Sequence, residues 1–168
     1  MDLDDESTKL WLGHAPFTVY EPAFGHHSVY INQGSDLDQY RYQLGHEAFH
    51  RVCGLTRHWV HEMLAELLTF ARLREAGHSA HAAWAEARWV TIAPAVSLDV
   101  LHLWSGGGDP ASYARAYVVG QELVELCGWE RTCELVHFYD HQWRPDPERW
   151  ADALPADSAS EARRIMGL

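Results

Sequence analysis

The sequence predicts a mainly helical α+β fold for this chain of 168 residues, and three observations support that prediction. Apolar residues recur at three- and four-residue spacing over long stretches, which is the period of an amphipathic helix. Short segments rich in β-branched and aromatic residues occur near the N-terminus. Glycine and proline clusters separate these segments. Because 47% of the residues are hydrophobic, we expect residues 1–168 to form one domain with its own core.

The N-terminal segments carry the predicted β-structure. Residues 17–20 and 28–31 are β-prone and are separated by Pro22 and Gly25, which predicts a short hairpin or edge pair of strands. A turn at residues 32–36 follows, in which Ser35 or Asp36 can cap the next helix. The acidic residues 1–8 are expected to form a disordered tail.

The remaining chain is predicted to be helical. The helix after the turn ends near Gly54 and Thr56, where the chain reverses, and a second helix runs from Trp59 to about Glu75. These two helices can pack antiparallel. Further helices are expected at residues 79–92, 96–104, 111–127, 130–139 and 158–166, with a flexible glycine turn at 106–108 and loops at Pro145, Pro147 and Pro155.

The first of these helices contains the pentapeptide His46-Glu47-Ala48-Phe49-His50, a HExxH motif. A four-residue step on a helix brings His46 and His50 to one face, a single turn apart, so both can bind one metal ion. Glu47 lies about 100° further round the helix, where it can reach a water molecule held by the metal. The motif therefore predicts a hydrolytic zinc site with Glu47 as general base.

Catalytic zinc usually has three protein ligands, so a third is expected after His50. Glu62, in the first turns of the second helix, can face back towards His50 and is the preferred candidate. Glu66, one turn later, is the alternative ligand.

The motif His46-Glu47-x-x-His50, followed by Glu62-Met63-Leu64-Ala65, resembles the gluzincin metallopeptidases, although the spacing from His50 to Glu62 is shorter than in their large members. The resemblance covers residues 26–140 and implies a minimal zincin-like domain with a short N-terminal hairpin or edge strand and a helical C-terminal part. It also implies zinc held by His46, His50 and Glu62, with Glu47 as the base. By the same resemblance, Tyr113 and Tyr117 are candidates for stabilising the oxyanion, with His102 behind them.

The composition of the chain limits the classes of binding partner that we expect. The net charge of −11 and the absence of a basic stripe argue against binding to nucleic acid or to an anionic membrane. No apolar run approaches the length of a membrane helix. Three cysteines without CxxC spacing favour a reducing cytoplasm. The expected substrate is a peptide or a small amide.

Three classes of function remain open. The first is a zinc-dependent metallopeptidase or amide hydrolase, which the HExxH spacing favours. The second is a non-haem Fe(II) oxygenase, because two histidines and one carboxylate also form its facial triad. The third is a non-catalytic zincin-like module that binds peptides, although such a module has no need of Glu47 as a base.

Overall fold

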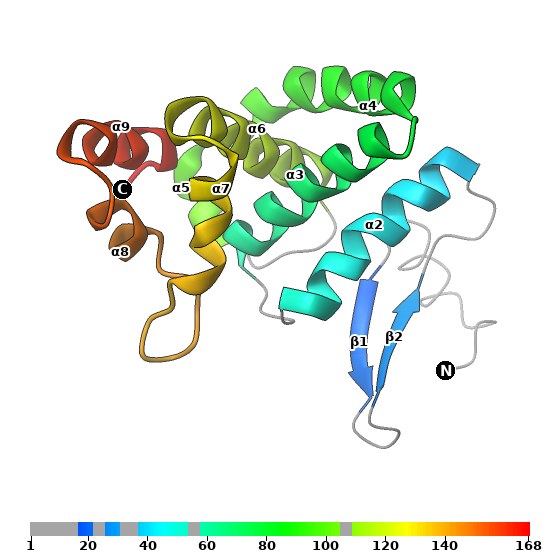
Figure 1. Cartoon of the computed structure of the whole chain (residues 1–168), viewed down its shortest axis with the longest axis horizontal. Coiled ribbons are helices and arrows are strands. Elements are labelled where there is room, and N and C mark those ends of the chain that lie inside the picture. Colours follow the sequence, from blue (N-terminus) through cyan, green and yellow to red (C-terminus); the bar gives the residue numbers. More distant parts are fainter. Residues whose placement is uncertain (1–16, 22–25, 31–36, 54–57, 105–108) are drawn as a thin grey trace.

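The computed structural model describes residues 17–21, 26–30, 37–53, 58–104 and 109–168. This part of the chain is mainly helical (Figure 1), which confirms the prediction of a mainly helical protein. The helices, including two short 3₁₀-helices, are in chain order α2 (Leu37–Cys53), α3 (Trp59–Glu75), α4 (Ser79–Ile92), η1 (Ala93–Ala95), α5 (Leu98–Leu103), α6 (Pro110–Cys127), α7 (Trp129–Cys133), η2 (Glu134–His137), α8 (Pro147–Asp152) and α9 (Ala156–Met166).

Two strands precede the helices. β1 (Phe17–Glu21) and β2 (His26–Tyr30) pair antiparallel, with Phe17 opposite Tyr30 and Glu21 opposite His26. Both strands contact α2, which crosses beside them in Figure 1.

Helix α3 lies at the centre of the core. It packs against α2, α4 and α6, and nearly all of its residues between Trp59 and Phe70 are buried. Gly120 on α6 sits so close to α3 that an added Cβ would lie 2.7 Å from Leu67 and 2.8 Å from Met63. Close packing in the core therefore fixes the position of α3, the helix that begins beside the predicted metal site.

Most predicted helices are present, with local corrections. α3 and α4 have the predicted bounds. The segment 96–104 is helical only over α5, after the 3₁₀-helix η1, and 130–139 divides into α7 and η2. The prediction of a loop at Pro147 was wrong, because Pro147 occupies the first turn of α8. Proline suits that position because its fixed φ is helical and because a backbone N–H in the first turn has no partner within the helix. The Asp146 side chain caps the helix by accepting the N–H of Arg149.

Several predictions fall outside the described residues: the tail at 1–8, the cap at Ser35 or Asp36, the turn at Gly54 and Thr56, and the glycine turn at 106–108. Among the helices that the structure describes, none has both the length and the apolar character needed to span a membrane.

Candidate metal centre

Helices α2 and α3 bring the three predicted ligands together. His46 and His50 lie one turn apart on α2, and Glu62 lies in the first turn of α3. The two helices run in opposite directions and pack against each other (Figure 1), so the beginning of α3 lies beside the end of α2 that carries the histidines. In the part of the chain that the structure describes, His46, His50 and Glu62 form a cluster able to hold a metal ion.

The ligand atoms of this cluster form a nearly equilateral triangle. Nε2 of His46 lies 3.1 Å from Oε2 of Glu62 and 3.1 Å from Nε2 of His50, and Nε2 of His50 lies 3.2 Å from the same Glu62 oxygen. Ligand atoms about 2.0–2.1 Å from a tetrahedral zinc ion are about 3.3 Å from one another. The three side chains therefore fit one face of a zinc coordination shell.

Burial makes the cluster a strong electrostatic site. His46, His50 and Glu62 are 5%, 8% and 6% exposed. Burial by itself disfavours the protonated form of His46, but hydrogen bonds to Glu62 and Glu66 outweigh it and raise the pKa of His46 well above its ordinary value. Burial likewise disfavours an ionised Glu62, yet hydrogen bonds from His46 and His50 lower its pKa to about 2. The lowered pKa keeps Glu62 ionised at neutral pH, so the site favours a positive charge. A bound divalent cation would supply that charge.

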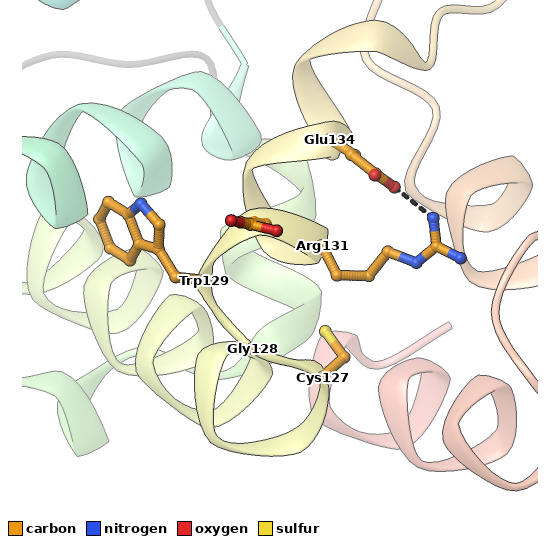
Figure 2. A pocket seen from close by; sticks show the side chains of 6 residues that line it. Cys127, Gly128, Trp129, Arg131 and Glu134 are labelled. Atoms are coloured by element: carbon orange, nitrogen blue, oxygen red, sulfur yellow. Dashed lines mark hydrogen bonds and ion pairs between the residues drawn. The ribbon is translucent and has the colours of Figure 1, made fainter.

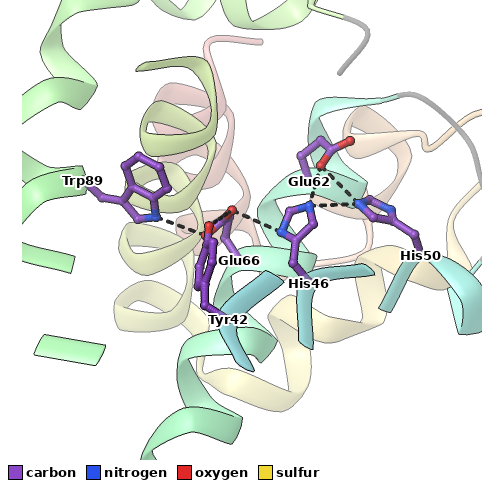
Figure 3. Close-up of polar contacts among 6 residues, drawn as sticks. All are labelled: Tyr42, His46, His50, Glu62, Glu66 and Trp89. Carbon is purple, nitrogen blue, oxygen red and sulfur yellow. Dashed lines mark hydrogen bonds and ion pairs between the residues drawn. The ribbon is translucent and has the colours of Figure 1, made fainter. Parts of the chain in front are cut away.

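A second carboxylate lies beside the other ring nitrogen of His46. Oε1 of Glu66 lies 3.1 Å from Nδ1 of His46, on the side of the ring that faces away from the ligand triangle (Figure 3). The structure therefore gives Glu66, the alternative third ligand, a different position. The contact is an ion pair at short range, and among the described residues Nδ1 has no partner with the geometry of a hydrogen bond. A carboxylate at this distance favours the proton on Nδ1, which leaves Nε2 free for a metal.

Glu66 is itself held by two aromatic side chains. The hydroxyl of Tyr42 donates to its carboxylate at 2.6 and 2.7 Å, and Nε1 of Trp89 donates to Oε2 at 3.1 Å (Figure 3). Burial and the adjacent Glu66 carboxylate raise the pKa of Tyr42 well above 10, so its hydroxyl stays a neutral donor. Neither residue was among the predicted site residues. Tyr42 precedes His46 by one helical turn, a signal that could have found it, whereas Trp89 arrives through the packing of α4.

The predicted base, Glu47, is 3% exposed and directly follows the ligand His46 on α2. A buried carboxylate needs hydrogen-bonding or charged partners, and Glu47 has at least one interaction within the protein. Its place in the sequence of α2 is that of the carboxylate in a HExxH helix.

The structure separates the two tyrosine candidates. The ring of Tyr113 lies T-shaped to the ring of His46, with centroids 5.7 Å apart, and T-shaped to the ring of Trp104, with centroids 4.7 Å apart. Tyr117 lies in the core instead: its hydroxyl donates to Glu86 and accepts from Gln121. Burial, followed by the Glu86 carboxylate, raises the pKa of Tyr117. Of the two, Tyr113 is the one next to a predicted ligand.

The third candidate, His102, has other partners. Its Nε2 donates to the carbonyl oxygen of Met166 at 2.6 Å, and its ring stacks on Trp59 with centroids 5.6 Å apart. These contacts tie α5 to the end of α9 and the start of α3.

An open hollow lies elsewhere, at the junction of α6 and α7 (Figure 2). It is lined by Cys127, Gly128, Trp129, Glu130, Arg131 and Glu134, and Arg131 forms an ion pair with Glu134. None of its lining residues belongs to the His46, His50 and Glu62 cluster, so the hollow and the cluster are separate features.

Comparisons with protein-family models, with curated proteins and with solved structures gave no match for this chain. The resemblance to gluzincins therefore stays a prediction from the motif.

Proposed function

We propose that this protein is a zinc-dependent hydrolase that cleaves peptide or amide bonds. The observation that carries the proposal is the buried triangle of atoms from His46, His50 and Glu62, with separations of 3.1–3.2 Å. The two histidines lie on α2, the helix that also carries Glu47. A zinc ion held by these three groups would act as a Lewis acid and would lower the pKa of a water molecule that it binds.

The protein's own residues account for the remaining chemistry. Glu47 would take a proton from the attacking water and return it to the leaving amine, because one carboxylate can serve both steps when it stays within hydrogen-bonding distance. Glu66 would keep His46 in the tautomer whose Nε2 is free. Tyr113 is the candidate donor to the developing negative charge on the carbonyl oxygen, since its ring contacts His46.

The low solvent exposure of these residues would also favour the reaction. The ligands and Glu47 are each less than a tenth exposed. Interactions among charged groups are stronger where water is excluded, so the carboxylate base and the ligand triangle act on a substrate with little screening.

The test is hydrolysis of a quenched fluorescent peptide library by zinc-loaded wild-type protein and by Glu47→Gln. The amide is close in size to the carboxylate but cannot accept the proton. We expect turnover to fall by at least about a hundredfold, with the zinc content unchanged. Turnover that survives the substitution would contradict the role of Glu47.

The chosen control is Glu75→Gln, which changes an exposed glutamate at the end of α3 and should leave turnover intact. The metal found in the purified protein separates the alternatives. Iron instead of zinc, with activity only in the presence of oxygen, would favour the oxygenase hypothesis. Zinc binding without hydrolysis in the wild type would favour a non-catalytic module.

A further inference from the structure

Helix α4 is attached to the core through few side chains. All of α4 belongs to the described part of the chain, yet it buries one residue, Ala82, whereas most residues of α3 are buried. The inner face of α4 carries two alanines and two side chains that make polar contacts: Ala82, Ala85, Glu86 and Trp89. The helix lies at the edge of the molecule in Figure 1. A helix with so little buried apolar surface opens more readily than the core.

The two polar contacts of α4 reach different parts of the protein. Glu86 accepts a hydrogen bond from the hydroxyl of Tyr117 on α6. Nε1 of Trp89 donates instead to Oε2 of Glu66, at 3.1 Å (Figure 3). The other oxygen of this carboxylate, Oε1, lies 3.1 Å from Nδ1 of His46. One residue of α4 is thus bonded to the carboxylate that lies beside a predicted ligand.

The two donors to Glu66 restrain its carboxylate differently. The hydroxyl of Tyr42 lies 2.6 and 2.7 Å from the two oxygens, so it contacts both almost equally. A donor equidistant from both oxygens restrains rotation of the carboxylate about its Cγ–Cδ bond only weakly. Trp89 donates to Oε2, on one side of the carboxylate, while Oε1 lies beside His46. The indole N–H is therefore the donor that determines how the carboxylate is turned.

We propose that Trp89 is a positioning residue that couples the docking of α4 to zinc binding, acting through the Glu66 carboxylate. The inference rests on the proposed function. While α4 is docked, the Glu66 side chain is 1% exposed and lies beside His46. When α4 moves away, the carboxylate loses a donor and can turn from Nδ1, so the ring becomes a weaker ligand. Coupling between two equilibria is reciprocal, so zinc binding in turn stabilises the docked α4.

The first experiment compares zinc affinity in the wild type and in Trp89→Phe, by competition with a chromophoric chelator. Phenylalanine keeps an aromatic ring but has no N–H to donate. Trp150→Phe is the matched control, because the Nε1 of Trp150 also donates a hydrogen bond, to the carbonyl oxygen of Arg131 at 3.0 Å. Trp150 lies on α8, which contributes no residue to the His46, His50 and Glu62 cluster. Urea unfolding shows that each variant is folded.

We expect Trp89→Phe to weaken zinc binding by about three- to tenfold, less than removal of the carboxylate itself. Trp150→Phe should leave zinc affinity unchanged. In the Glu66→Gln background, Trp89→Phe should have no further effect, because the carboxylate through which Trp89 acts is absent. If Trp89 served packing alone, its substitution would lower stability, but its effect on zinc affinity would not depend on Glu66.

Hydrogen exchange followed by mass spectrometry measures the reciprocal effect. Adding zinc should slow amide exchange in residues 79–92 of the wild-type protein, because the docked state of α4 gains stability. In Trp89→Phe this slowing should be lost, whereas exchange in α3, which carries Glu62, should still slow.

Three results would overturn the role of Trp89 while the proposed function stands: zinc affinity unchanged in Trp89→Phe, an equal loss in Trp150→Phe, or an undiminished effect in the Glu66→Gln background. Exchange in α4 that ignores zinc, in wild-type protein that binds it, would overturn the coupling to α4. Wild-type protein that binds no zinc would overturn both proposals.

Discussion

At the scale of the residue, the buried ring of His46, the predicted ligand, has a contact at each of its two nitrogens. Its Nε2 belongs to the ligand triangle and its Nδ1 lies 3.1 Å from Glu66. Tyr42 and Trp89 in turn fix the Glu66 carboxylate. The position of the Glu66 carboxylate beside His46 is thus set by hydrogen bonds within the protein.

Substituting Glu66→Gln should weaken zinc binding by about 10- to 100-fold, the usual effect of removing a carboxylate behind a histidine ligand. The amide preserves the volume but removes the negative charge beside Nδ1. Zinc affinity is measured by competition with a chromophoric chelator. Tyr42→Phe, which leaves the carboxylate in place, should have a smaller effect. An unchanged affinity in Glu66→Gln would show that His46 is oriented by other contacts.

The sequence could predict that His46 and His50 lie together, because helical geometry determines which residues share a face once the segment is helical. It could also place Glu62 beside them, whereas its role as the third ligand stays a prediction. It could not separate Tyr113 from Tyr117, since both lie on α6 one turn apart, and only tertiary packing directs one towards His46 and the other towards Glu86. The sequence could not predict the contact of Trp89 with Glu66 for the same reason, because it depends on tertiary packing.

At the scale of the element, the start of α3 determines where Glu62 lies. His58 caps this helix: its Nδ1 accepts the N–H of Val60 at 3.2 Å. Burial, followed by the charges of His61 and His102, lowers the pKa of His58 from 6.5 to about 4. The cap requires the neutral ring, because protonated Nδ1 cannot accept a hydrogen bond.

This cap predicts a loss of stability in acid. Between about pH 6.5 and 4 the unfolded chain binds a proton at His58 that the folded protein does not, so the free energy of unfolding decreases as the pH falls through this window. His58→Asn keeps a capping oxygen but does not titrate. Urea unfolding at pH 7, 5.5 and 4 should therefore show a steeper decrease for the wild type than for the variant. Parallel decreases would contradict the assignment.

The packing of α6 against α3 predicts a second effect. Gly120→Ala would place a methyl group 2.7 Å from Leu67 and 2.8 Å from Met63, so we expect the free energy of unfolding to fall by about 1–3 kcal/mol. Gly45→Ala is the matched control, because its new Cβ would lie 3.4 Å from Thr69, an ordinary contact. Chemical denaturation measures both. Equal stability of the two variants would show that α6 can shift away from α3.

Prediction of elements succeeded where long apolar periodicity dominates, as in α3 and α4. It was least accurate for short helices. The six residues of α8 contain too few turns to show a period, and their proline reads as a loop signal unless its place in the first turn is known.

At the scale of the whole molecule, the proposed metal would join two helices that are separate in sequence. Two ligands come from α2 and one from α3. A cation that binds the folded state and not the unfolded chain raises the free energy of unfolding by about 4 kcal/mol at a thousandfold excess over its Kd.

Removing the metal should therefore lower the melting temperature by about 10 °C, given about 2–4 °C per kcal/mol for a protein of this size. Differential scanning calorimetry with and without a chelator measures the shift, and added zinc should reverse it. His50→Ala should melt at the same temperature in both conditions. A wild-type melting temperature insensitive to chelator and to zinc would mean that no metal connects α2 with α3.

The most direct test of the central claim is the metal content per chain, measured by inductively coupled plasma mass spectrometry on protein purified without added metal or chelator. Wild type is compared with His46→Ala and Glu62→Ala, and with His137→Ala, an exposed histidine on η2, as control. We predict about one zinc ion per chain in the wild type and the control, and its loss from both ligand variants. Wild-type protein without bound metal, or zinc retained in His46→Ala and Glu62→Ala, would contradict the account.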